Sequence, residues 1–182
     1  MPIIDTSYFQ NELSIGQITS PSVIAAVALY IEKYEEEYLS NMLGYELYKE
    51  YKAGIAVLPT PLVIWTNLRD GVEYTYYDSL TKWKGLKFTT GTLKRSPIAN
   101  YVYYNYLKDT VSFTMGSGEV KPQSTAVVNV SPMSKMVRAW NEMVDWNREL
   151  IEYLDANETL YTGYEYSYAR DYLLRPINSF NL

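Results

Sequence analysis

The sequence predicts a mainly α protein: a helical bundle with long helices, a small β-hairpin, a long inter-helix loop and an extended C-terminal arm. Three observations lead to this class. Ser or Thr precedes Pro at the start of apolar-rich segments, two long segments show helical periodicity, and one stretch alternates like a strand. Ser and Thr can cap the first N–H groups of a helix, and Pro fits its first position. The pairs are Ser20-Pro21, Thr60-Pro61, Ser96-Pro97 and Ser131-Pro132.

The first predicted helix runs from Pro21 to Leu43. Apolar residues at three- and four-residue steps form one stripe along it: Ile24, Val27, Ile31, Tyr34, Tyr38 and Met42. Gly44 ends this helix. Two shorter helices are expected next, one from Glu46 to Ala53 that Gly54 stops, and one that starts after Thr60 and ends near Asp70-Gly71.

A change of periodicity follows these helices. Val72 to Tyr76 alternates between apolar and polar residues, Asp78-Ser79 suits a turn, and Thr81 to Lys84 can return as a second strand. We therefore predict a small hairpin at about 72–88.

The next segment, from Pro97 to Phe113, reads as a helix with apolar residues over much of its circumference. These are Ile98, Tyr101, Val102, Tyr104, Tyr106 and Leu107. Such a helix lies at the centre of a core or at an interface.

The clearest helix runs from Pro132 to about Asn157. It has near-heptad apolar spacing and one polar interruption at Asn147; the apolar positions are Met133, Val137, Trp140, Val144, Ile151 and Leu154. A long loop at about 115–130 precedes it, and a Tyr-rich segment follows it. We expect a helical domain over residues 1–160 and a C-terminal docking arm over 161–182.

The composition excludes several classes of function. The chain has no Cys and no His, which removes thiolate chemistry, the usual general base and the commonest transition-metal ligand. A net charge of −5 argues against a general nucleic-acid-coating role. The start MPIIDTSYFQ does not resemble a signal peptide, and the longest apolar run, Val23–Tyr30, is too short to span a membrane. We expect a soluble protein with no cofactor and no contact with a membrane.

The glycine-containing loop MGSGEVKPQS, Met115–Ser124, does not fit a phosphate site. A P-loop needs a Lys followed by Ser or Thr after its second Gly, whereas Gly118 precedes Glu119, and Lys121 precedes Pro122. Long loops between helices are usually binding elements or disordered segments. The β-type run from Thr125 to Val130 favours binding, for instance by strand addition to a neighbouring chain.

Charged residues gather in three stretches. The glutamates Glu32, Glu35, Glu36 and Glu37 are expected on a solvated face, as are Glu142, Asp145, Glu149 and Glu152, with Lys135, Arg138 and Arg148 placed to pair at helical spacing. The third stretch, between Ser79 and Lys108, is basic and holds no acidic residue. It is either a solvated hairpin or a contact with nucleic-acid phosphate or an acidic partner, with Lys82, Lys84 and Lys87 as its DNA-facing candidates.

Tyrosine is the strongest compositional signal, with 20 residues. Tyr combines a large apolar area with a polar end, so it suits protein interfaces. We interpret the excess over what one core needs as contact surface.

The chain resembles the head-to-tail connector (adaptor or ring) proteins of tailed bacteriophages, of the type found in crAss-like and related phages of gut Bacteroidales. The resemblance spans most of the chain. It rests on YEEEYLSNMLGYELYKEYKAG, GVEYTY, KWKGL, YVYYNYLKDTVSFTMGSGEVK, SPMSKMVRAWNEMV and the closing INSF. Residues Thr89–Arg95 and the tail from Tyr161, apart from its closing INSF, match nothing in that family.

The resemblance implies a structural virion protein made in the cytoplasm of the host bacterium and located at the head–tail junction. Such proteins form a ring, typically of about twelve copies, that joins the portal to the tail and extends the DNA channel. It implies a homo-oligomer, contacts with the portal and with tail or further connector proteins, non-specific contact with genomic DNA, and no enzyme activity.

We predict that partner contacts come from the helix at 97–113, the loop and the arm. The candidate interface residues are Tyr101, Tyr104, Gly116, Gly118, Glu119, Lys121, Val127, Val128, Tyr164, Tyr166, Tyr168 and Phe180. Two alternatives stay open: another structural role in a virion, such as a tail or capsid-auxiliary protein, and a carboxylate-based hydrolase that pairs Glu46 or Glu50 with Glu73.

Overall fold

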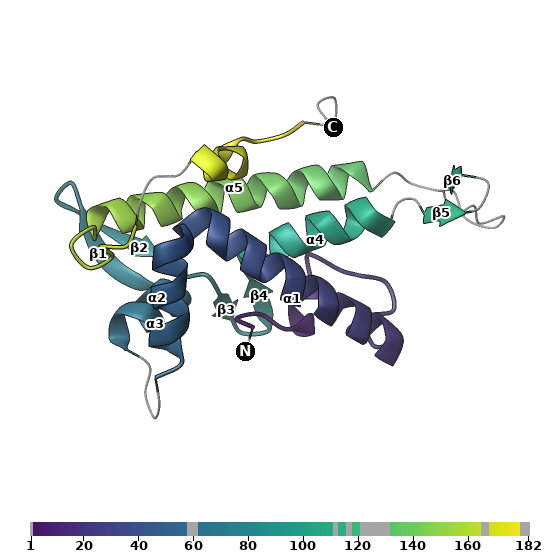
Figure 1. Cartoon of the computed structure of the whole chain (residues 1–182), viewed down its shortest axis with the longest axis horizontal. Coiled ribbons are helices and arrows are strands. Elements are labelled where there is room, and N and C mark those ends of the chain that lie inside the picture. Colours follow the sequence, from purple (N-terminus) through teal and green to yellow (C-terminus); the bar gives the residue numbers. More distant parts are fainter. Residues whose placement is uncertain are drawn as a thin grey trace.

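The structure of the chain is a computed structural model that describes residues 2–57, 62–110, 132–164 and 168–178, together with the strands at 113–115 and 118–120. Within these residues the chain is mainly helical, with small antiparallel sheets of two strands each (Figure 1). The predicted mainly α class is confirmed at this level.

The core is built on three helices. These are α1 (Pro21–Leu43), α4 (Pro97–Thr110) and α5 (Met133–Ala156), and α4 packs against both of the others. Every residue from Pro97 to Tyr103 is buried. Of the two places expected for the apolar helix at 97–113, the structure therefore selects the centre of the core (Figure 1).

The predicted helix starts are correct where the structure describes them. The Ser96 hydroxyl accepts hydrogen bonds from the backbone N–H groups of Ile98, at 3.1 Å, and Ala99, at 3.4 Å. Ser20 occupies the N-cap of α1 without a side-chain cap bond. Thr60, Pro61 and Ser131 lie outside the described residues, α3 spans Val63–Asp70, and α5 begins directly after Pro132.

The prediction that Gly54 stops the second helix is wrong. Helix α2 spans Tyr45–Ile55 and runs through Gly54. This glycine faces the Trp65 ring of α3, where a side chain would overlap the indole, so it permits close packing of the two helices instead of ending α2. Gly44 does end α1, with a positive φ of 79°.

Strands β1 (Val72–Tyr76) and β2 (Ser79–Trp83) form the predicted hairpin, with Val72 opposite Trp83 and Tyr76 opposite Ser79. The turn lies one residue earlier than expected. Tyr77 and Asp78 are its central residues, with φ of 45° and 61°. Positive φ at both positions matches the twist of the flanking strands in tight hairpins.

A second hairpin, β3 (Phe88–Thr90) with β4 (Leu93–Arg95), follows immediately and was not predicted. The prediction of a helix as far as Phe113 is also wrong, because α4 ends at Thr110 and strand β5 (Phe113–Met115) pairs with β6 (Gly118–Val120). Thr110, Val111, Phe113 and Thr114 are β-branched or aromatic, a composition that favours strands over helix. Residues 116–117 and 121–130 of the predicted loop lie outside the described residues.

The C-terminal segment is less extended than predicted. A 3₁₀ helix, η2 (Tyr168–Leu174), packs on α5 and α1 of the same chain. The Asn147 side chain donates to the carbonyl of Leu173 at 2.8 Å, and the Trp140 indole N–H donates to that of Arg175 at 2.9 Å. A short N-terminal 3₁₀ helix, η1 (Thr6–Phe9), packs against α1, α4 and β4.

Candidate assembly surfaces

The first half of α1 is an exposed surface without charge. Residues Pro21–Ile31, the uncharged end of α1, contain no Asp, Glu, Lys or Arg. Leu29 is 67% exposed and Ile24 is 39% exposed, and the alanines between them are exposed as well. Ile24, the first residue of the apolar stripe, is therefore exposed, because this end of α1 extends beyond its neighbours (Figure 1).

The turn of the first hairpin is a second exposed surface. We call three exposed residues of this hairpin, Tyr77, Leu80 and Lys82, the hairpin tip; Tyr77 and Leu80 lie at or beside the turn, and Lys82 lies further along β2, opposite Glu73. Tyr77 is 86% exposed and Leu80 is 77% exposed. Tyr77 also holds a positive φ, a conformation that costs a non-glycine residue about 1–2 kcal/mol. The Tyr77 ring packs only against that of Tyr76, at 4.5 Å, among the ring pairs of the described residues, and an exposed aromatic residue in a strained turn favours a role in contact.

A groove of about 860 Å³ lies between α1, α2 and the N-terminal segment. Its apolar lining includes Ile3, Ala28, Leu39 and Ile55. Its charged residues are three glutamates and one lysine: Glu32, Glu35, Glu36 and Lys52. We call it the acidic groove.

Glu35 is the buried member of this groove and corrects the expected solvated face. Its carboxylate accepts hydrogen bonds from the backbone N–H of Ile3, at 2.8 and 3.0 Å, and of Ile4, at 3.3 Å. Burial raises the pKa of Glu35 above its ordinary value, while these hydrogen bonds act in the opposite direction. Glu35 therefore fixes the N-terminal segment along one wall of the groove.

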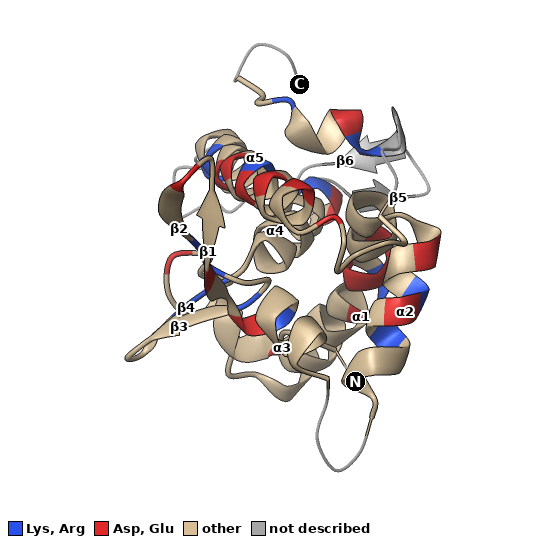
Figure 2. Cartoon of the chain, turned by 90° about the vertical axis from the view of Figure 1, so that its left-hand side faces the viewer, with Lys and Arg blue, Asp and Glu red and all other residues tan. Residues whose placement is uncertain are grey.

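The basic stretch is largely neutralised by carboxylates from elsewhere in the chain. Lys84 pairs with Glu149 at 2.6 Å and Lys87 with Asp70 at 3.4 Å. The Arg95 side chain pairs with Glu12, and that of Lys94 approaches Asp5 at 4.0 Å. Basic and acidic residues are accordingly interspersed over the hairpins and α5 (Figure 2).

These pairs change the assignment of DNA-facing lysines. Lys84 and Lys87 are engaged in ion pairs, so neither is a free cation for phosphate. Lys82 is exposed and forms no ion pair within the described part of the chain. It is one of the residues that line a cleft of about 520 Å³, in which acidic side chains of α5 face basic ones of the hairpins.

The predicted pairing along α5 is confirmed for Arg138 and Arg148, whereas Lys135 forms no ion pair among the described residues. Arg138 lies 3.8 Å from Glu142, and Arg148 lies 3.3 Å from Asp145. Burial raises the pKa of Glu142, since this carboxyl lies partly inside the cleft.

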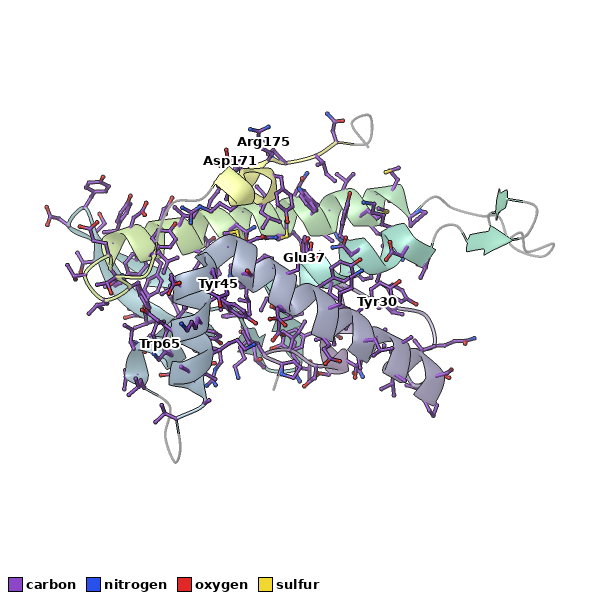
Figure 3. The ribbon with its side chains drawn as sticks, viewed as in Figure 1. Tyr30, Glu37, Tyr45, Trp65, Asp171 and Arg175 are labelled. Carbon is purple, nitrogen blue, oxygen red and sulfur yellow. The ribbon has the colours of Figure 1, made fainter. Side chains whose placement is uncertain are left out.

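Of the tyrosines predicted at the interface, the structure describes the side chains of three, one buried and two half-buried. Tyr101 is buried, and its hydroxyl donates to Glu37, which α1 directs toward α4 (Figure 3). Burial raises the pKa of Tyr101 well above its ordinary range. Tyr104 is half-buried against Trp140 at a ring distance of 4.6 Å, and Tyr164 lies under the Arg170 guanidinium at 4.7 Å. Tyr101 is therefore a core residue rather than a contact residue.

The other predicted interface residues fall in two groups. Gly118 and Glu119 belong to β6, and Tyr168 begins η2. The remaining six lie outside the described residues: Gly116, Lys121, Val127, Val128, Tyr166 and Phe180.

Sequence reasoning missed the uncharged end of α1, the hairpin tip and the acidic groove. The sequence does carry a signal for the first, since eleven residues without charge inside a helix are more than one buried stripe requires. The groove has no such signal, because it depends on how α2 and the N-terminal segment meet α1.

Comparison with known proteins finds no family model, no curated protein and no solved structure that matches this chain. The helices of the described residues are all too short or too polar to cross a membrane. Among the same residues, no three carboxylates converge in a way that could hold a metal ion.

Proposed function

We propose that this chain is a structural virion protein that assembles into a ring and joins the portal of a tailed phage to its tail. The observation that carries the proposal is the uncharged end of α1. Its exposed apolar side chains belong to the same helix whose second half is buried in the core, so they form a rigid contact surface. A contiguous exposed apolar surface of this kind marks a site of protein–protein interaction.

The geometry of the chain suits assembly by non-identical surfaces. The uncharged end of α1 and the hairpin tip lie toward opposite ends of the long axis (Figure 1). Contacts between different surfaces of identical subunits generate a ring when the rotation between neighbours closes. The long helices would form a wedge-shaped bundle, and loop residues 115–130 would reach the portal, the tail or the adjacent subunit.

The ion-paired hairpins fit a position beside a DNA channel. Because Lys84, Lys87 and Arg95 are paired, they offer little net attraction to phosphate. A channel through which DNA must pass benefits from contacts that are weak and independent of sequence.

The mass of the purified protein in solution, measured by light scattering alone and after mixing with the cognate portal, tests the proposal. We expect a ring of about twelve copies of the 21.1 kDa chain, alone or on the portal. The Leu29→Asp variant should stay monomeric with an unchanged circular dichroism spectrum, since it places a charge in the apolar contact. The Leu160→Asp variant, which changes an exposed leucine elsewhere, is the matched control.

A wild-type protein that remains monomeric with and without the portal would refute the connector proposal. Assembly that ignores the portal but requires another tail or capsid protein would point instead to a different structural role in the virion.

A further inference from the structure

The acidic groove has the properties of a docking site. Its volume of about 860 Å³ exceeds the space of two or three large side chains, and it combines an apolar floor with carboxylates. Glu32 is exposed and has no ion-pair partner among the described residues. Glu36 has one, the exposed Lys52 ammonium at 3.8 Å. The groove therefore carries more negative than positive charge.

The wall of the groove also contains an unsatisfied polar group. Tyr51 lines the groove and is only 3% exposed, yet its hydroxyl has no hydrogen-bond partner within the described residues. Buried hydroxyl groups are normally satisfied, so the Tyr51 hydroxyl is a polar group that the described part of the single chain leaves without an acceptor or a donor. A segment that brings apolar side chains and a cation would match both the apolar floor of the groove and its excess of negative charge.

The hairpin tip carries these properties. Tyr77 and Leu80 are the most exposed large apolar side chains among the described residues. Lys82 follows Leu80 by two positions on β2, so both side chains extend from the same face of the strand. The Lys82 ammonium has no ion pair, whereas its neighbours Lys84 and Lys87 do.

The hairpin tip does not fill the groove of its own chain. None of its residues lines that groove, and β1 and β2 pack instead against α5. The tip and the groove are thus two complementary surfaces, apolar with opposite charge, that one copy cannot bring together. Contact between them requires a second copy.

We infer that the acidic groove between α1, α2 and the N-terminal segment receives the hairpin tip of a neighbouring copy. This inference rests on the proposed function, and it names the contact that joins adjacent subunits. Lys82 of one copy lies beside Glu32 of the next, and the Tyr77 and Leu80 side chains enter the apolar floor. The contact is heterologous, as a closed ring requires.

Charge reversal tests the pairing. Lys82→Glu and Glu32→Lys should each weaken assembly about tenfold, because each places like charges opposite one another. The double variant should return assembly to near the wild-type level. Lys108→Glu, which reverses another exposed lysine that has no ion pair among the described residues, should leave it unchanged. Sedimentation velocity over a concentration series gives the dissociation constants, and thermal melts verify that every variant folds.

Cross-linking gives a second, independent readout, because the chain contains no Cys. An Ala28→Cys variant and a Leu80→Cys variant, mixed under oxidising conditions, should form a disulfide-linked heterodimer at a yield well above that of either variant alone. Cross-linking that occurs only between identical variants would mean an isologous contact and would overturn the inference.

The outcomes separate this inference from the proposed function. If the wild-type protein assembles but the double variant does not recover and the mixed cross-link is absent, the docking inference is wrong and the ring proposal stands. If the wild-type protein never assembles, the ring proposal itself is wrong and the docking inference falls with it.

Discussion

Glu35 and its three neighbouring glutamates look equivalent in sequence, yet only Glu35 is buried. Its partners, the N–H groups of Ile3 and Ile4, lie more than thirty positions away in the chain, at separations of 32 and 31. Periodicity places a residue on a helix face, but it does not tell which distant segment will cover that face. Gly54 shows the same limit, because its neighbour Trp65 belongs to another helix.

At the residue scale we predict that Gly54→Ala destabilises the protein. Alanine in a helix interior gains about 1 kcal/mol over glycine. The added methyl group would overlap the Trp65 indole, which packs between Tyr51 and Tyr161, and overpacking of this kind costs about 1–3 kcal/mol. We expect the overlap to prevail and the free energy of unfolding to fall, as measured by urea denaturation.

Gly16→Ala is the matched control for Gly54→Ala. A methyl group at Gly16 would meet nothing within 4 Å. The free energy of unfolding of this variant should therefore match that of the wild type within about 0.5 kcal/mol. A Gly54→Ala protein that is more stable than the wild type would show that helix propensity outweighs the contact with Trp65.

At the scale of elements, helices with a local signal could be predicted closely. The bounds of α1 follow from Ser20-Pro21 and Gly44, and α5 follows from its apolar repeat. The β3–β4 hairpin was missed because strands of three residues carry too few positions for a periodic pattern. Helix η2 was missed because its order comes from contacts with α5, above all those of Asn147, rather than from its own sequence.

The interruption of the apolar face of α5 by Asn147 leads to an element-scale prediction. The fully buried Asn147 accepts a hydrogen bond from the Tyr38 hydroxyl and donates one to the Leu173 carbonyl, so it links α1, α5 and η2. Asn147→Leu keeps the number of side-chain heavy atoms but leaves two buried groups unpaired, each at a cost of about 1–3 kcal/mol. Chemical denaturation should show a lower free energy of unfolding for this variant than for the wild type.

Adding Tyr38→Phe to Asn147→Leu separates the two hydrogen bonds. The phenylalanine removes the orphaned hydroxyl, so the double variant should be more stable than Asn147→Leu alone. Equal stability of the two would mean that the Tyr38 bond contributes nothing measurable.

At the scale of the whole molecule, tyrosine builds the core as well as the surface. Nine of the 20 tyrosines are buried within the described residues, and many pack ring against ring around α1, α4 and α5. The interpretation of the tyrosine excess as contact surface was therefore too broad. Composition reports how much tyrosine a chain has, but only the packing of long helices decides which rings face inward.

The buried tyrosines predict a cooperative response to alkaline pH. Burial raises the pKa of Tyr38, Tyr51, Tyr101 and Tyr161 in the folded state above the value of about 10 expected for unfolded chains. The stability that depends on these groups is therefore fully present below about pH 10 and is lost as the pH rises further. Tyrosinate absorbance near 295 nm should rise together with the loss of helical circular dichroism.

The same titration of the chain unfolded in urea provides the reference curve. The folded protein should release its tyrosyl protons at higher pH than the unfolded chain. Superimposable curves, with the helical signal intact throughout, would contradict the burial of these rings.

Trp140 gives the molecule an internal optical reporter. Its indole N–H donates to the Arg175 carbonyl, and its ring lies 6.2 Å from that of Tyr172. Detachment of the C-terminal segment would open this indole to water, which shifts indole emission to longer wavelengths. The difference spectrum between the wild type and a Trp140→Phe variant would therefore follow, without any added label, whether this segment stays on its own chain when subunits assemble.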